Sequence, residues 1–176
     1  MKKSVLLLFF AGCVATGIFG IGRKIPMNRV NDLGQREGYW RDSVGGGFVY
    51  DLYYKGGKKD GLYKRFYRNK LFLFGEYTAD NMSGTWYMFG DEGELRCTID
   101  SIELNKDSIY TGYCRIFCKY KCHSIDYYPS GAVKSEGYMV CDEEFEIEIW
   151  EIGEWKYYDE SGNLIKTKDY GDRRTP

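Results

Sequence analysis

The sequence has few of the residues on which many functions depend. Its single histidine is His123, so no catalytic dyad or triad can use a second one. The net charge is −1, with 25 basic and 26 acidic residues interspersed, which disfavours a strongly basic nucleic-acid binder. Proline occurs only 3 times, and the mean hydropathy of −0.50 excludes a protein with many membrane spans.

The chain is instead rich in aromatic residues and glycine. Of its 176 residues, 17 are tyrosine, 10 phenylalanine, 4 tryptophan and 22 glycine. Aromatic residues favour β-strands, and glycine favours the tight turns between them. This length fits one domain or one repeat array with a substantial core. The composition therefore predicts an all-β protein.

A glycine followed two residues later by a large aromatic residue recurs along the chain. Three copies lie 23 residues apart, and a fourth lies 69 residues beyond the third. The glycines are Gly38, Gly61, Gly84 and Gly153, and the aromatic residues are Trp40, Tyr63, Trp86 and Trp155. Three residues further on lie Phe66, Phe89 and Tyr158, with Ser43 in the first copy. A period of this length is typical of stacked supersecondary units, and these residues form the predicted repeat core.

Each unit is predicted to be one β-hairpin of two short strands, with five or six residues in each. The repeated glycine is expected in a turn, where it permits positive φ without strain. A second turn follows at Gly47, Lys70, Gly93 and Gly162. The aromatic residues are expected to form the shared core between hairpins.

We count five units, because Tyr127–Tyr138 matches Phe66–Tyr77 at a constant offset of 61 residues. In that copy Cys122-His123-Ser124 replaces Gly61-Leu62-Tyr63. The exact phase of Gly153 is a coincidence or the trace of a decayed unit. The expected domains are an export signal or membrane anchor at 1–22, a linker at 23–35, the array at 36–170 and a disordered tail at 171–176. Insertions are expected near 100–120 and 142–152.

Two segments of the array resemble the MORN-repeat variant of bacterial proteins. They are Gly34–Arg41 and Gly153–Leu164, whose glycine, aromatic residue, turn glycine and apolar residue follow the pattern of that family. The resemblance covers roughly residues 34–96 and 122–170. It implies an elongated antiparallel array of β-hairpins acting as a scaffold or protein-binding module. Some bacterial members are labelled as antitoxin-type components, and a link to membrane lipids is contested. The family supplies no catalytic residue.

The amino terminus has the pattern of an export signal. Lys2 and Lys3 precede an apolar run, residues 5–22, which ends at Arg23 and Lys24. Three outcomes are open: cleavage within 17–22, lipidation at Cys13, or retention as an uncleaved anchor helix. Cys13 follows Phe10-Ala11-Gly12, which resembles a lipobox, although the apolar residues after it are unlike the usual polar tether. Each outcome predicts a periplasmic or envelope location.

The remaining cysteines have three open interpretations. Cys114, Cys118 and Cys122 are four residues apart and, with His123, chemically suit zinc or, less closely, haem attachment. Their spacing differs from the common motifs, so disulfide bonds or reduced core thiols are favoured. Cys97 and Cys141 complete the set. No metal and no cofactor are predicted.

Two other patterns have simpler explanations than a site. From Glu144 to Glu151 acidic and apolar residues alternate, as in a strand with one buried face. The stretches Gly45–Gly47 and Gly56–Lys59 lack the context of a phosphate loop and are expected to be hairpin turns.

The sequence thus predicts a non-enzymatic, exported protein-interaction or scaffold module at the bacterial envelope. Its partner is expected to be a protein, with membrane association through the amino terminus and no nucleic acid. The alternative is an antitoxin-type regulator that binds a toxin. An enzyme that uses Cys114–His123 is the third hypothesis.

Overall fold

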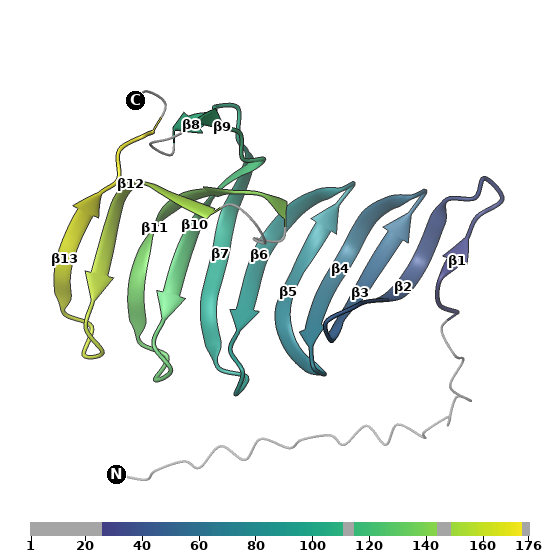
Figure 1. Ribbon diagram of the computed structural model, residues 1–176, viewed down its shortest axis with the longest axis horizontal. Helices are drawn as coiled ribbons and strands as arrows, with labels where there is room; N and C mark the ends of the chain where they lie inside the picture. Colours follow the sequence, from purple (N-terminus) through teal and green to yellow (C-terminus); the bar gives the residue numbers. More distant parts are fainter. Residues whose placement is uncertain (1–25, 111–114, 144–148, 174–176) are drawn as a thin grey trace, which may run out of the picture.

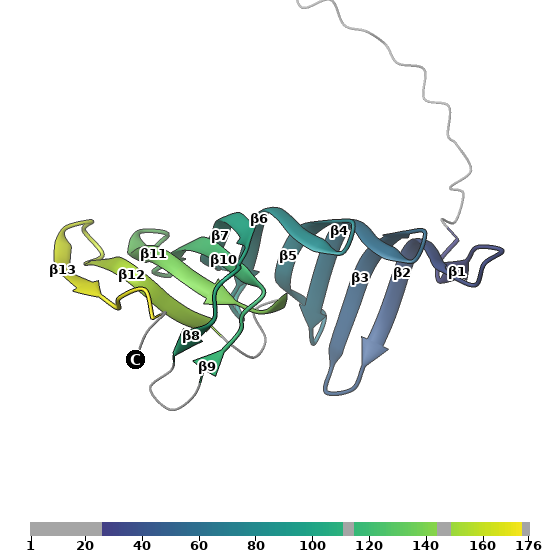
Figure 2. The ribbon, with the colours of Figure 1, turned by 90° about the horizontal axis from the view of Figure 1, so that it is seen from above.

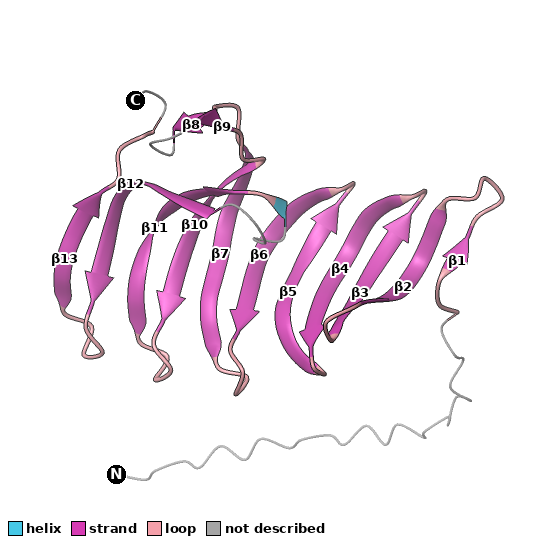
Figure 3. Cartoon of the chain, in the orientation of Figure 1, coloured by secondary structure: helices cyan, strands magenta, loops and turns pink. Residues whose placement is uncertain are grey.

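The structure, a computed structural model, describes residues 26–110, 115–143 and 149–173. The expected signal or anchor helix at 1–22 lies outside these ranges. Within them the chain is all-β, and the short piece coloured as helix in Figure 3 is a 3₁₀ turn at Glu143, not an α-helix. One antiparallel sheet of 11 strands contains most of the described residues, and neighbouring strands stand side by side along its long axis (Figure 1).

The sheet consists of a short edge strand followed by five hairpins that pair in chain order. The edge strand is β1 (Arg29–Val30). The hairpins are β2 (Arg36–Val44) with β3 (Phe48–Lys55), β4 (Lys58–Tyr67) with β5 (Lys70–Thr78), β6 (Asn81–Phe89) with β7 (Leu95–Leu104), β10 (Tyr120–Tyr127) with β11 (Val133–Cys141), and β12 (Ile149–Tyr158) with β13 (Leu164–Asp169). The predicted array of hairpins is therefore confirmed.

The hairpins end in turns whose sequences explain their shape. Gly93, Gly131 and Gly162 have φ of +84°, +86° and +84°, and each donates its N–H to the carbonyl three residues earlier. Asp159 reinforces the last of these turns, because its carboxylate accepts hydrogen bonds from the backbone of Ser161 and Asn163. Glycine is favoured at such positions because it has no Cβ to strain the left-handed backbone.

The repeated Gly-x-aromatic glycines have positive φ as expected, but they do not lie in hairpin turns. Gly61, Gly84 and Gly153 lie inside β4, β6 and β12, where the register with the neighbouring strand shifts. At each shift the strand with the glycine has additional residues, so the glycine permits a β-bulge. Because the motif is inside the strand, the strands of the hairpins are mostly 8–10 residues long, longer than expected.

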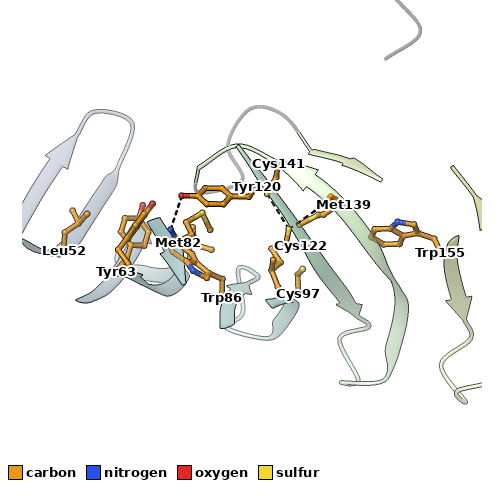
Figure 4. Packing of buried hydrophobic residues seen from close by; sticks show 13 residues of the cluster. Leu52, Tyr63, Met82, Trp86, Cys97, Tyr120, Cys122, Met139, Cys141 and Trp155 are labelled. Atoms are coloured by element: carbon orange, nitrogen blue, oxygen red, sulfur yellow. Dashed lines mark hydrogen bonds between the residues drawn. The ribbon is translucent and has the colours of Figure 1, made fainter. Parts of the chain in front are cut away.

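One face of the sheet, called the inner face below, carries the main buried cluster (Figure 4). Its side chains come from successive strands, from Leu52 on β3 to Trp155 on β12. In its centre the rings of Tyr63, Tyr77 and Trp86 contact one another, with centroids 5.3–5.7 Å apart. Such ring pairs add to the stabilisation from apolar burial. A single sheet thus obtains a core by bending and by stacking aromatic side chains.

Two irregular segments interrupt the succession of hairpins. Between β7 and β10 the chain forms a small hairpin, β8 (Ile109–Tyr110) with β9 (Arg115–Ile116), beside the end of β11 (Figures 1 and 2). Between β11 and β12 lie residues 142–148, of which 144–148 are outside the described residues. Met139, Val140 and Cys141 are all buried although they alternate between faces, so the end of β11 is covered on both sides.

Candidate binding surface

The predicted repeat-core residues occupy two kinds of position. Tyr63, Trp86 and Trp155 are buried on the inner face, whereas Trp40 is half-buried and has the Arg36 guanidinium 4.4 Å from its ring centroid. Phe66, Phe89 and Tyr158 are half-buried where their strands meet the turns. These side chains build the sheet, so a binding site would be formed by the surfaces that they support.

A cavity of about 470 Å³, called the central hollow below, opens on the inner face where the third and fourth hairpins meet. Six strands contribute to it, and its wall is partly apolar and partly polar. The lining residues are Phe72, Met88, Phe89, Arg96, Cys97, Ile99, Ser124, Asp126, Tyr127, Lys134, Met139 and Ile149. A volume of this size suits one or two large side chains of a partner or a small ligand.

Polar groups in and next to the hollow contact one another. Ser135 Oγ donates to Asp126 Oδ2 at 2.8 Å, and Cys97 Sγ lies 3.3 Å from Ser124 Oγ. Ser124 and Ser135 are buried, so these bonds replace water that the serines lose. At the margin, Arg96 and Lys134 are exposed and place positive charge beside the apolar wall.

The thiol in the hollow is poorly suited to nucleophilic chemistry. Burial raises the pKa of Cys97 to about 12, and the neighbouring carboxylate of Asp126 also acts to raise it. The thiolate is the reactive form of cysteine, so at neutral pH Cys97 is an unreactive thiol.

The described cysteines lie in two separate places. Cys97, Cys122 and Cys141 belong to the inner-face cluster, whereas Cys118 packs with Ile109 and Val140 in a second small cluster. All of these cysteines are free, so the disulfide interpretation is not met for them. The sulfur atoms of Cys122 and Cys141 are 3.6 Å apart, well beyond the ~2 Å of a disulfide bond. The hydrogen bond with Cys122 and burial both raise the pKa of Cys141.

The proposed grouping of Cys114, Cys118, Cys122 and His123 is not assembled by the described part of the chain. Cys114 lies outside it, and Cys118 and Cys122 face different clusters. Among the described residues, no group of three or more histidine, cysteine or acidic side chains is placed to hold a metal ion. His123 lies on the other face of β10, where its Nδ1 is 3.5 Å from Asp100 and its ring contacts Tyr138.

Ionic contacts connect Glu143, just after β11, to a distant strand of the sheet and to the residue before β10. Glu143 Oε2 lies 3.5 Å from Lys59 Nζ of β4, and Glu143 Oε1 accepts a hydrogen bond from Lys119. Partial burial would raise the pKa of Glu143, but the hydrogen bond from Lys119 and the charges of both lysines outweigh it and lower the pKa. Glu143 is therefore held to Lys59 and Lys119 by charge.

Two glycines that the repeat pattern did not single out are needed to build the inner face. A Cβ on Gly75 would lie 2.1 Å from the Trp86 ring, and one on Gly137 would lie 2.5 Å from the Trp155 ring. A glycine inside an apolar strand pattern is a sequence signal for such close packing. These glycines accommodate the indoles that the repeat pattern does predict.

No protein-family model matches the chain, and no curated protein matches it significantly. Within the described ranges, no helix has the length and apolar character that a membrane span requires.

Proposed function

We propose that this protein is a non-enzymatic, exported interaction module that binds a protein partner through the central hollow, at the bacterial envelope. The observation that carries the proposal is the hollow itself. It combines an apolar wall with an exposed cationic margin at Arg96 and Lys134. This composition suits a partner segment that inserts apolar side chains and carries acidic residues beside them.

The chemistry of the hollow supports binding more than catalysis. The pKa of its thiol is raised, the Oγ of its serine Ser124 lies 3.3 Å from that thiol, and its carboxylate accepts a hydrogen bond from the nearby Ser135. His123 is on the opposite face of β10 from Ser124, because successive side chains of a strand alternate. A histidine-activated nucleophile would need these groups within hydrogen-bond reach.

The proposed location rests on sequence alone. Lys2, Lys3 and the apolar run at 5–22 have the pattern of an export signal, and Cys13 is the candidate for lipidation. MORN-like character of the repeats is likewise proposed from the sequence pattern. Mass spectrometry of the mature amino terminus distinguishes cleavage, lipidation and retention.

Site-specific photo-crosslinking in cells tests the hollow. A photoreactive amino acid is placed at Arg96 or Lys134 of the full chain, and at Lys58, an exposed residue at the start of β4, as a control. We expect one protein partner to crosslink from both margin positions and not from Lys58. Arg96→Glu with Lys134→Glu should remove the crosslink from a third hollow position, Phe89. The matched reversal Lys55→Glu with Lys58→Glu should leave it unchanged.

Three results would contradict the proposal. They are equal crosslinking from the control position, insensitivity to charge reversal at the margin, and turnover of a small molecule by the purified chain. Recovery of a cytosolic toxin as the partner, together with an unprocessed amino terminus, would instead support the antitoxin-type regulator.

A further inference from the structure

The two edges of the sheet differ in how far their backbone N–H and C=O groups already have hydrogen-bond partners. At the amino-terminal edge, β1 pairs with β2, and Asn28 continues the ladder beyond it. The Asn28 side chain donates to the carbonyl of Arg41 and accepts from its N–H, at 3.0 and 2.8 Å. The Asn28 N–H also donates to the carbonyl of Tyr39 at 2.9 Å. These bonds occupy backbone groups that a further strand would need.

The carboxy-terminal edge has no equivalent cover among the described residues. There β13 has β12 as its only neighbouring strand, and all of its residues are exposed. The N–H of Tyr170 donates to the carbonyl of Gly153 in β12. In an antiparallel pair every second residue bonds to the neighbouring strand, so the N–H and C=O groups of Lys168 and Lys166 also point to β12. By the same alternation, the N–H and C=O groups of Thr167 and Asp169 point away from the sheet, where another strand could bond to them.

The side chains of this edge are charged in a specific arrangement. Lys166 Nζ lies 4.6 Å from the Tyr157 ring centroid, and Lys168 Nζ lies 3.9 Å from that of Tyr170. Tyr157 and Tyr170 pack against the inner-face cluster, so both lysines are on the inner face. An added strand would therefore place every second side chain next to this positive pair.

This charge arrangement disfavours a second copy of the chain as the added strand. A two-fold axis perpendicular to the sheet pairs residues of the same face in antiparallel strands. If the axis passes at Lys166 or Lys168, that lysine lies opposite its own copy. If it passes at Thr167, Lys166 of each copy lies opposite Lys168 of the other. Like charges directly opposite each other destabilise a strand pair.

We propose that β13 is a docking edge that accepts an extended acidic segment of a partner protein as an additional strand. The backbone of Thr167 and Asp169 supplies the hydrogen bonds, and carboxylates at alternate positions of the segment face Lys166 and Lys168. This edge lies at the end of the array, and the proposal stands independently of the central hollow.

A fluorescently labelled synthetic peptide in which glutamate alternates with valine tests the proposal by anisotropy with the full chain. Lys166→Glu with Lys168→Glu should weaken binding by about tenfold or more, and added salt should weaken binding to the unaltered chain. Thr167→Pro, which removes one outward N–H and no charge, should weaken it comparably. The matched reversal Lys55→Glu with Lys58→Glu should change affinity by less than about twofold.

The peptide backbone provides the sharper control. Backbone N-methylation at every second residue removes the donors on one edge of the peptide. Strand addition requires that only one of the two alternating methylated sets abolishes binding, because an added strand uses one edge. As a control, thermal unfolding of each protein variant is measured to check that the variant remains folded.

Several outcomes would overturn the proposal. They are equal loss of binding with both methylated sets, equal affinity for a peptide with lysine in place of glutamate, and unchanged affinity after the Lys166 and Lys168 reversal. Concentration-dependent dimerisation of the unaltered chain that Thr167→Pro abolishes would assign the edge to a second copy instead.

Discussion

At the scale of single residues, glycine has two different physical roles in this sheet. Gly75 does not have a positive φ. Glycine is needed there because the indole of Trp86 lies where a Cβ would be. Gly162 has φ of +84°, and a Cβ added there would meet nothing within 4 Å, so its importance comes from backbone conformation alone. Substitutions at the two positions should therefore behave differently.

We predict that Gly75→Ala destabilises the protein by about 1–3 kcal/mol, because Trp86 must move within a packed core. Chemical denaturation measures this effect, with Glu76→Ala on the exposed face of the same strand as the control. The penalty should shrink when Trp86 is also replaced by leucine, as a double-mutant cycle would show. An additive cycle would contradict steric conflict with the indole as the cause.

At the scale of the element, three of the hairpins have the same type of turn. Gly93, Gly131 and Gly162 have nearly the same φ, and the space around each is open. Alanine at any of them should therefore cost a similar amount, about 1 kcal/mol, and asparagine should cost less. Denaturation midpoints of the six variants check this order. Costs that differ widely between the three alanine variants would show that contacts, and not the backbone, decide the effect.

The hairpins were predictable from the sequence because their signals are local. The turn glycines and the aromatic period gave the all-β class and the number of units, although the strands are longer than expected. The error came from the Gly-x-aromatic glycines, since positive φ suits a bulge within a strand as well as a turn. The central hollow was not predictable in this way. It depends on how six strands, from Phe72 of β5 to Ile149 of β12, come together, which no local pattern encodes.

At the scale of the whole molecule, long-range contacts connect parts of the chain that are not neighbours in the order of hairpins. Tyr120 of β10 extends across the inner face, and its hydroxyl accepts a hydrogen bond from the N–H of Met82 at 3.1 Å (Figure 4). Glu143 reaches Lys59, which is 84 residues earlier in the chain. These contacts connect the third hairpin to the start of the fourth, and the second hairpin to the residue Glu143 after β11. They should therefore couple parts of an array whose units otherwise contact only neighbours.

The Glu143 contact should make stability depend on pH. Its folded pKa lies below the unfolded value, so its contribution is fully present above the unfolded pKa of roughly 4.5 and is lost as pH falls through the folded pKa. Glu143→Gln should therefore lower the melting temperature at pH 7, and the difference from the unaltered chain should diminish on acidification below about pH 4. Thermal melts followed by circular dichroism across this range measure it, with Glu160→Gln on an exposed turn as the control. A constant difference at all pH values would mean that the carboxylate contributes through packing and not through its charge.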